Sequence, residues 1–143
     1  MSDLNLGLLL FIPYRAMEQR VFAGLAKAGF DDFTPAQARV FQRIAPDGSR
    51  LTDLAYQAQI TKQSAGFLVD QLERAGYIER APDPTDARAR LVCIAARGAA
   101  AVPIAAAIVA EVEAEWDAHL GKQRMTQLRQ HLTRLREVTD PYQ

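Results

Sequence analysis

Apolar residues recur every three or four positions through residues 4–28, which is the period of an amphipathic helix. The first part of this segment is apolar nearly all round, so we expect burial on more than one side, and Gly29 is placed to end the helix. Pro13 must then lie in a first turn or kink the helix. The same period predicts two further helices near the other end of the chain, over residues 96–119 and 122–137.

Three shorter helices are predicted between these long ones. The first starts at Thr34, because Gln37 three residues later completes a capping box and Pro35 suits the first helical position. The second is a short helix that Thr52 can cap, and the third opens at Thr61.

A β-hairpin follows the third short helix. Residues 77–80 and 90–94 have the composition of two strands, and residues 81–89 between them are predicted to form a polar loop with two prolines. Two short helices, a tight turn and a hairpin describe a winged helix-turn-helix, which we place at residues 31–98. The predicted fold class is therefore mainly α with a small β-hairpin wing, flanked by N- and C-terminal dimerisation helices.

The flanking helices carry more apolar surface than one small winged module can cover. We therefore expect a single domain over residues 1–143, in which segments 1–30 and 99–143 intertwine with a second copy as an isologous homodimer. A twofold dimer places two reading helices about one duplex turn apart, which predicts a near-palindromic site on double-stranded DNA.

Charge gives this interpretation no support by itself. Lys plus Arg and Asp plus Glu number 17 each, so the formal net charge is zero, and residues 31–98 carry nine basic and nine acidic side chains. Nucleic-acid binders often have a basic excess, so a DNA-binding function must rest on where the charges lie. The apolar fraction of 49% is that of an ordinary globular protein and excludes disordered and fibrous classes.

Targeting signals are missing from the N-terminal sequence. The apolar run 8–12 is far shorter than the roughly 20 residues of a membrane span, and no basic region precedes it as in a signal peptide. We expect a cytoplasmic protein with no membrane partner. Cys93, the single cysteine, fits a reducing compartment, and we interpret it as a small apolar filler in a strand rather than a redox switch.

The sequence contains no pattern typical of an enzyme. We find no glycine-rich phosphate loop and no Cys-His or Ser-His pairing that could form a site. His119 and His131 have no Cys or His three or four residues further on, which argues against a metal site. We therefore expect no catalytic residue, no metal and no cofactor.

The third short helix begins with side chains suited to reading DNA. Its first turn supplies a cation, an amide and two hydroxyl groups, from Thr61, Lys62, Gln63 and Ser64. A major groove about 12 Å wide admits one helix, whose N-terminal residues reach the base edges. Phe67 falls off the apolar stripe of this helix, so we expect it to face DNA, where it can touch a thymine methyl.

Four segments of the winged region form a recognisable set: residues 51–55 (LTDLA), 61–64 (TKQS), 72–78 (LERAGYI) and 83–88 (DPTDAR). Together they resemble the MarR (multiple antibiotic resistance regulator) family of winged helix-turn-helix transcription regulators. The wing, Asp-Pro-x-Asp-x-Arg after Leu-Glu-x-x-Gly, is the most specific part. The resemblance implies that Arg88 enters the minor groove and Asp86 steadies the loop, and we expect Arg90 to contact the DNA backbone.

The chain departs from the family pattern at two places. Gly66-Phe67 stands where the family often has a basic or polar residue, and Ile94-Ala95 replaces the usual Leu-Thr cap after the wing. A helical glycine costs about 1 kcal/mol relative to alanine, and a lost capping oxygen costs roughly 1 kcal/mol. These changes bear on affinity and sequence preference rather than on the fold.

The resemblance implies a ligand-responsive regulator, which we interpret as a repressor. Family members bind small anionic aromatic effectors between the winged lobe and the dimer helices, and the candidates to line such a pocket are Tyr14, Arg15, Arg39 and Trp116. The alternative is a dimeric winged-helix module that binds proteins, with weak or no DNA binding. Zero net charge and Gly66-Phe67 favour that alternative.

Overall fold

The structure is a computed structural model that describes residues 3–141. Residues 1–2 and 142–143, the outermost parts of the predicted dimerisation segments, lie outside the described residues. Helices and one two-stranded antiparallel hairpin follow in the predicted order. Their bounds are α1 (Leu6–Lys27), α2 (Pro35–Phe41), α3 (Leu51–Ala58), α4 (Lys62–Arg74), β1 (Ile78–Asp83), β2 (Asp86–Ile94), α5 (Ala96–Leu120) and α6 (Lys122–Thr139).

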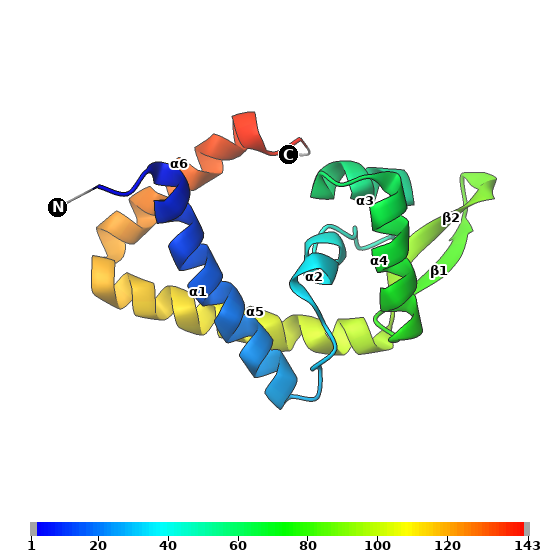
Figure 1. Cartoon of the computed structure of the whole chain (residues 1–143), viewed down its shortest axis with the longest axis horizontal. Coiled ribbons are helices and arrows are strands. Elements are labelled where there is room, and N and C mark those ends of the chain that lie inside the picture. The colour runs from blue at the N-terminus through cyan, green and yellow to red at the C-terminus, as the bar shows by residue number, and fades with distance from the viewer. Residues whose placement is uncertain (1–2, 142–143) are drawn as a thin grey trace.

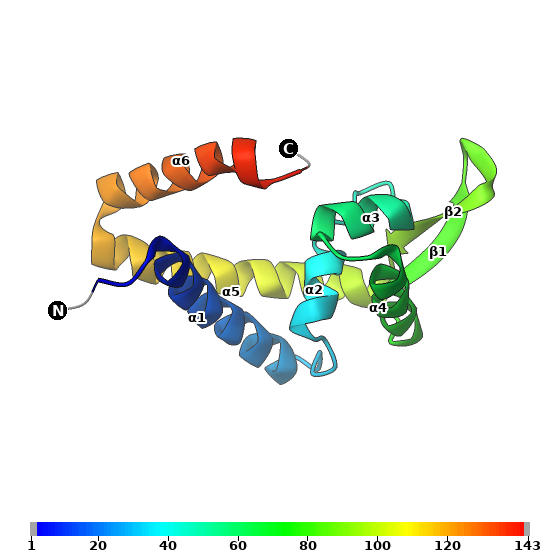
Figure 2. The ribbon, with the colours of Figure 1, turned by 45° about the horizontal axis from the view of Figure 1, so that its top comes forward.

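Helix α5 connects the two ends of the molecule (Figure 1). The winged lobe of α2, α3, α4 and the hairpin gathers at its beginning, whereas α1 crosses it further along. At the end of α5 the chain turns, and α6 runs back toward the side on which α3 lies (Figure 2). The helices α1 and α5 approach closely at Gly24, where an added Cβ would lie 2.2 Å from Cδ1 of Ile108.

Helix α1 leaves much of its apolar surface open within one chain. It begins after Asn5, whose side chain accepts a hydrogen bond from the Leu8 amide at 2.9 Å, and Pro13 lies inside the helix rather than in its first turn. Leu25 near the end is buried, but Leu6 is 76% exposed. The predicted burial of the first half on more than one side is therefore not met by the chain's own residues.

The predicted N-caps of α2 and α4 are confirmed. The Thr34 hydroxyl accepts from the Gln37 amide at 3.2 Å, and the Gln37 side chain accepts from the Thr34 amide at 3.1 Å, which completes the capping box. The Thr61 hydroxyl accepts from the Ser64 amide at 3.0 Å. As expected from Ile94-Ala95, α5 begins without a capping side chain.

The predicted cap at Thr52 is wrong. Helix α3 already begins at Leu51, and the residue at the cap position is Arg50, whose side chain makes no capping hydrogen bond. The reason lies in the wing, because Ser49 pairs with Val92 of β2 through backbone hydrogen bonds of 2.9 and 2.8 Å. This bridge holds the chain extended up to Arg50, so the helix starts immediately afterwards and the Arg50 side chain is left available for another contact.

The wing is longer and its loop shorter than predicted. Strand β1 pairs antiparallel with β2, with Ile78 opposite Ile94, and only residues 84–85 separate the two strands. The predicted loop 81–89 is therefore wrong. Pro82 does not interrupt β1, because each strand of a two-stranded sheet has a free edge where the missing amide proton is not needed. As a result, Arg88 and Arg90 lie on a strand.

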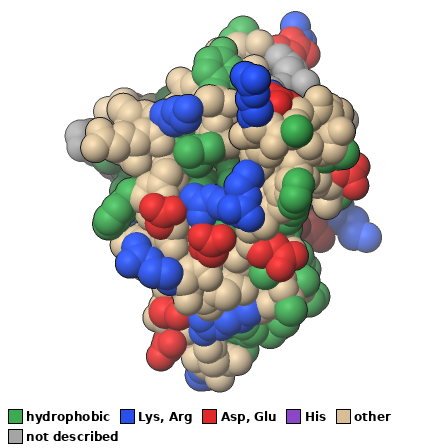
Figure 3. Space-filling view, turned by 90° about the vertical axis from the view of Figure 1, so that its right-hand side faces the viewer, with side chains coloured by type: hydrophobic (Ala, Val, Ile, Leu, Met, Phe, Trp, Pro, Cys, Tyr) green, Lys and Arg blue, Asp and Glu red, His purple; other side chains and the backbone are tan. Residues whose placement is uncertain are grey.

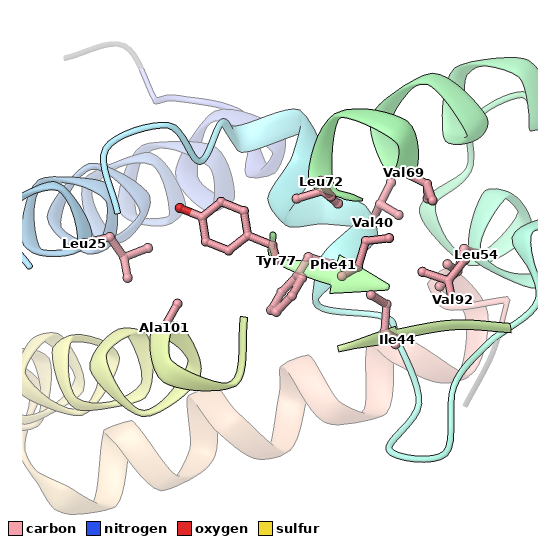
Figure 4. Close-up of a cluster of buried hydrophobic side chains, with 11 residues drawn as sticks. Leu25, Val40, Phe41, Ile44, Leu54, Val69, Leu72, Tyr77, Val92 and Ala101 are labelled. Carbon is pink, nitrogen blue, oxygen red and sulfur yellow. The ribbon is translucent and has the colours of Figure 1, made fainter. Parts of the chain in front are cut away.

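The hydrophobic core lies between α2, α3, α4 and the hairpin (Figure 4). Its largest fully buried side chains are Tyr77, Leu54, Leu72, Ile78, Val40 and Val69. Burying a side chain of this size stabilises the fold by about 1.5–3 kcal/mol. Leu25 of α1 and Ala101 of α5 belong to the same cluster, so the winged lobe shares its core with the ends of both long helices.

A second link between the lobe and α5 is polar. The Arg97 guanidinium lies 4.3 Å from the centre of the Tyr77 ring, and it donates to Asp32 at 2.9 and 3.0 Å and to the Ala75 carbonyl at 2.7 Å. The Tyr77 hydroxyl also donates to Asp32. Arg97, followed by Tyr77, lowers the pKa of Asp32, while burial and the bond to Asp32 raise the pKa of Tyr77. Three separate segments are thus joined at the start of α5.

Candidate nucleic-acid interface

The predicted contact residues at the start of α4 are exposed. The buried face of this helix is formed by Ala65, Val69 and Leu72, and Leu68 packs against the same core. Residues 61–64 are all exposed, and Phe67 is 59% exposed. All five predicted contact residues, Thr61 at the N-cap and the other four within α4, are therefore open to solvent.

Hydrogen bonds within the first turn of α4 determine which of its polar side chains are free to bind a ligand. The Thr61 hydroxyl caps the helix and lies 2.9 Å from the Ser64 hydroxyl. The Lys62 ammonium and the Gln63 amide extend from the same turn as exposed side chains. The unsatisfied amides and the dipole of a helix N-terminus add an attraction for phosphate.

The wing presents two exposed arginines near its tip. Arg90 lies opposite Pro82, whereas Arg88 lies in the irregular stretch of β2 between the Pro82–Arg90 and Asp83–Asp86 pairs. The Asp86 carboxylate accepts a hydrogen bond from the Arg88 amide at 3.0 Å. Asp86 thus holds the backbone of Arg88 and leaves its guanidinium free to extend outward.

The basic residues of this region differ in their ion pairing, and Arg39 and Arg74 also make no ion pair within the described residues. Within residues 3–141, no ion pair involves Lys62, Arg88 or Arg90. In contrast, Arg80 pairs with both Asp70 and Glu73 of α4. Figure 3 looks at the end of the molecule that carries the wing, where positive and negative side chains lie interspersed. One chain therefore offers isolated cations in this view rather than a continuous positive surface.

A separate cavity of about 450 Å³ lies between α1, α2 and α5. Most of its lining is apolar, and Tyr14, Glu18 and Arg39 supply polar groups. The Tyr14 hydroxyl donates to Glu18 at 3.0 Å, and burial followed by Glu18 raises the pKa of Tyr14. Arg15 and Trp116 are not among the lining residues, so the structure brings together only two of the four predicted pocket residues.

The Arg15 side chain instead packs along the surface of α1, the helix to which it belongs. Its guanidinium is 5.6 Å from the centre of the Phe11 ring, one turn earlier in α1. Trp116 lies half-buried near the end of α5.

Among the described residues, no helix has the length and apolar character that a membrane span requires. Residues 3–141 also hold no group of three or more His, Cys, Asp or Glu side chains that could bind a metal ion.

Two wing-associated residues were not identified from the sequence. Asp83 was part of the wing motif without an assigned role, and it is 6% exposed. Arg50 donates to its carboxylate from the start of α3. The motif itself could have drawn attention to Asp83, but no periodicity or local pattern connects two residues that lie 33 positions apart.

Residues 31–89 match the model of the MarR family. A search of curated proteins finds no match. Among solved structures, the chain is similar to a transcriptional regulator from Thermotoga maritima with 25% identity and a TM-score of 0.63, over 93% of this chain and 92% of that chain.

Two further structures agree. A MarR family protein of Mycobacterium tuberculosis in complex with salicylic acid is 26% identical with a TM-score of 0.66, over 94% of this chain and 98% of that chain. A complex of S. aureus MepR with DNA, at 22% identity, shows the likeness of fold alone, with a TM-score of 0.72 over 95% and 99% of the two chains. The resemblance predicted from the motifs is confirmed: residues 31–89 match the MarR family, and the chain as a whole has the winged-helix fold of that family's transcription regulators.

Proposed function

We propose that the chain is a sequence-specific DNA-binding transcription regulator that acts as a homodimer on a near-palindromic operator and represses transcription. The observation that carries the proposal is the exposure, on one lobe, of two sets of side chains that no ion pair within the described residues engages. They are Lys62 on the first turn of α4, and Arg88 with Arg90 on the wing. A helix and a wing held by one core can occupy the major groove and an adjacent minor groove together.

Each residue of α4 has a distinct role in this proposal. Lys62, Gln63 and Ser64 reach base edges or phosphates, because residues at the N-terminus of a recognition helix lie deepest in the major groove. Thr61 sets the start of that helix through its cap. Phe67, one turn further on, touches a thymine methyl.

The wing supplies the second contact. Arg88 inserts into the minor groove, where narrow A·T-rich stretches concentrate negative potential. Asp86 fixes the Arg88 backbone through the 3.0 Å hydrogen bond. Arg90, also exposed on β2, neutralises a phosphate, which adds affinity without reading sequence.

The homodimer is proposed from the apolar surface that one chain leaves open. The first half of α1 exposes a run of large apolar side chains, and α6 exposes Leu132, Leu135 and Val138. Exposed apolar area of this kind is typical of a protein interface. A second copy would cover both surfaces, which assigns segments 1–30 and 99–143 to dimerisation and 31–98 to DNA.

We further propose that a small anionic aromatic molecule occupies the cavity between α1, α2 and α5. Its apolar lining suits a ring, and Arg39 can pair with a carboxylate beside Tyr14. The M. tuberculosis relative was solved with salicylic acid, which supports this class of ligand. The cavity borders α2 of the winged lobe and the long helices α1 and α5. A bound ligand would therefore change the spacing of the two winged lobes in the dimer and thereby the affinity for the operator.

A second candidate function is a dimeric winged-helix module that binds another protein. The interspersed charges at the wing end (Figure 3) and the exposed Phe67 favour it. Such a module would keep the dimer and lose selectivity for DNA sequence.

Selection of bound duplexes from a random pool tests the two candidates. We expect enrichment of a near-palindrome with half-sites about one turn apart, and binding that weakens steeply as salt rises. Fluorescence anisotropy then measures the affinity, and added salicylate is expected to lower it. Recovery of no preferred sequence at modest ionic strength would reject the DNA-binding function and favour the protein-binding module.

A further inference from the structure

We propose that Arg50 is a positioning residue that fixes the wing for its minor-groove contact, an inference that rests on the proposed DNA-binding function. Arg50 itself does not contact DNA in this proposal. It acts by holding the two carboxylates of the wing tip, so that Arg88 lies at a set distance from the first turn of α4.

The contacts of Arg50 converge on the tip of the hairpin. Its Nε donates to Oδ2 of Asp83 at 2.9 Å, and its Nη2 lies 2.8 Å from the same oxygen. Its Nη2 is also 4.0 Å from Oδ2 of Asp86. One guanidinium at the start of α3 therefore spans both aspartates of the wing motif.

Asp83 in turn binds the turn between the two strands. Its other oxygen, Oδ1, accepts from the Thr85 amide at 2.8 Å and from the Thr85 hydroxyl at 2.7 Å. A carboxylate that is 6% exposed needs such partners, because burying it unpaired would be costly. The Thr85 hydrogen bonds, followed by Arg50, lower the pKa of Asp83, which keeps it ionised for the pairing.

The base of the wing is held by the neighbouring residue. Ser49 pairs with Val92 through two backbone hydrogen bonds, and the Arg50 side chain reaches the far end at Asp83. Residues 49–50 thus attach the hairpin to α3 at both ends. Since α3 and α4 share the core, this attachment sets where Arg88 stands relative to Lys62.

The pairing of Arg50 with the wing also reduces the negative charge that the wing would present to DNA. Asp83 and Asp86 both precede Arg88 in the wing, and two free carboxylates there would repel phosphate. Arg50 carries one positive charge, so its pairing with Asp83 offsets one of these two negative charges. This explains how a wing with equal numbers of acidic and basic side chains over residues 83–90 could approach DNA.

The competing explanation is that Arg50, whose side chain is 44% exposed, contacts phosphate directly. The variant Asp83→Asn distinguishes the two, because it removes an anion from the interface while its amide oxygen still accepts from Thr85. If Arg50 positions the wing, Asp83→Asn weakens binding roughly fivefold despite the lost negative charge. If Arg50 contacts phosphate directly, the same variant leaves affinity unchanged or raises it, and that result overturns the proposal.

A double-mutant cycle and a DNA-free measurement complete the test. In an Arg88→Ala background, Arg50→Ala is expected to cause little further loss of affinity, because Arg50 affects binding through the position of the wing. Additive losses would contradict the proposal.

Without DNA, Arg50→Ala is expected to speed hydrogen exchange across residues 83–90 while the melting temperature stays near that of the wild type. If the wild type selects no DNA but exchange still rises, the regulator function fails and the wing attachment stands. Unchanged exchange rejects the attachment.

Discussion

At the scale of single residues, two helical glycines differ in whether the packing leaves room for a side chain. An added Cβ at Gly66 of α4 would meet only Cδ2 of Leu51, at 3.7 Å, which is ordinary contact. At Gly98 of α5 the same atom would lie 2.3 Å from the Tyr77 carbonyl oxygen and 2.9 Å from the Phe41 ring. Gly98 is thus needed for α5 to reach the winged lobe, whereas nothing in the packing requires Gly66.

Alanine at each position tests this contrast. Gly66→Ala is expected to stabilise the protein by about 1 kcal/mol, because it removes the entropy cost of glycine in a helix. Gly98→Ala is expected to destabilise it by about 1–3 kcal/mol through overcrowding. Urea unfolding of both variants gives the free energies. A loss of stability in Gly66→Ala would show a close contact that the single chain lacks.

Asp32 predicts a pH dependence. Its pKa is lowered in the folded state, chiefly by Arg97, so its stabilising effect is complete above the unfolded-state pKa of about 3.9 and is lost as the pH falls through the lower folded-state pKa. Asp32→Asn should therefore be less stable than the wild type at pH 7, and the difference should shrink below about pH 4.

Urea unfolding at pH 7, 5 and 3 measures the difference. Asp47→Asn, in an exposed turn and without an ion pair in the described chain, serves as the control. A difference between Asp32→Asn and the wild type that stays constant from pH 7 to 3 would mean that Asp32 contributes no ionised pairing.

Residues that act locally were the ones predicted best from the sequence. Thr34 and Thr61 cap their helices as expected, because a cap depends on residues three positions away. Arg50 and Asp83 could not be paired from the sequence, since their contact exists only after the hairpin folds against α3. The misplaced cap at Thr52 has the same origin, because the Ser49–Val92 bridge decides where α3 begins.

At the scale of elements, the order of helices and strands followed from periodicity, whereas the wing did not. The polar composition of residues 81–89 predicted a loop, but cross-strand pairing and the Asp83–Thr85 turn extend both strands. Local composition contains no information on pairing across a hairpin. The outcome matters for function, because Arg90 is held opposite Pro82 in the sheet and the Arg88 backbone is held by its hydrogen bond to Asp86.

The caps of α2 and α4 allow a matched comparison of elements. Thr34→Ala and Thr61→Ala each remove a capping hydroxyl, and each is expected to cost about 1 kcal/mol of stability. Only Thr61→Ala should also weaken DNA binding, roughly tenfold, because α4 alone is proposed to enter the groove. Thermal melts and anisotropy separate the two effects. Equal losses of affinity in both variants would argue that stability alone controls binding.

At the scale of the whole molecule, the single chain is incomplete as a packing unit. Leu6 at the start of α1 and Val138 at the end of α6 are 76% and 82% exposed. The excess of apolar stripes over the surface of one winged module was evident in the sequence, and it led to the expectation of a dimer. The way α6 folds back from α5 toward the winged lobe was not predictable, because it depends on contacts with distant segments such as that between Arg43 and Asp140.

A charge placed on the open stripe of α6 tests the dimer. Leu135→Glu is expected to halve the mass seen by sedimentation velocity, since burying an unpaired carboxylate in an apolar interface is costly. Affinity for DNA with two half-sites should then fall toward that for one half-site. Gln130→Glu, on the opposite side of α6, is the control and should remain dimeric. An unchanged mass for Leu135→Glu would place the interface elsewhere.

Arg88→Ala is the sharpest test of the proposed contact with DNA through α4 and the wing. Anisotropy on the selected duplex should compare this variant with Arg124→Ala, which removes an exposed arginine from α6. We predict that Arg88→Ala lowers affinity roughly tenfold or more and reduces the salt dependence by about one counterion, while the dimer stays intact. Arg124→Ala should bind as the wild type does. Equal affinity of the two variants would exclude an Arg88 contact with DNA.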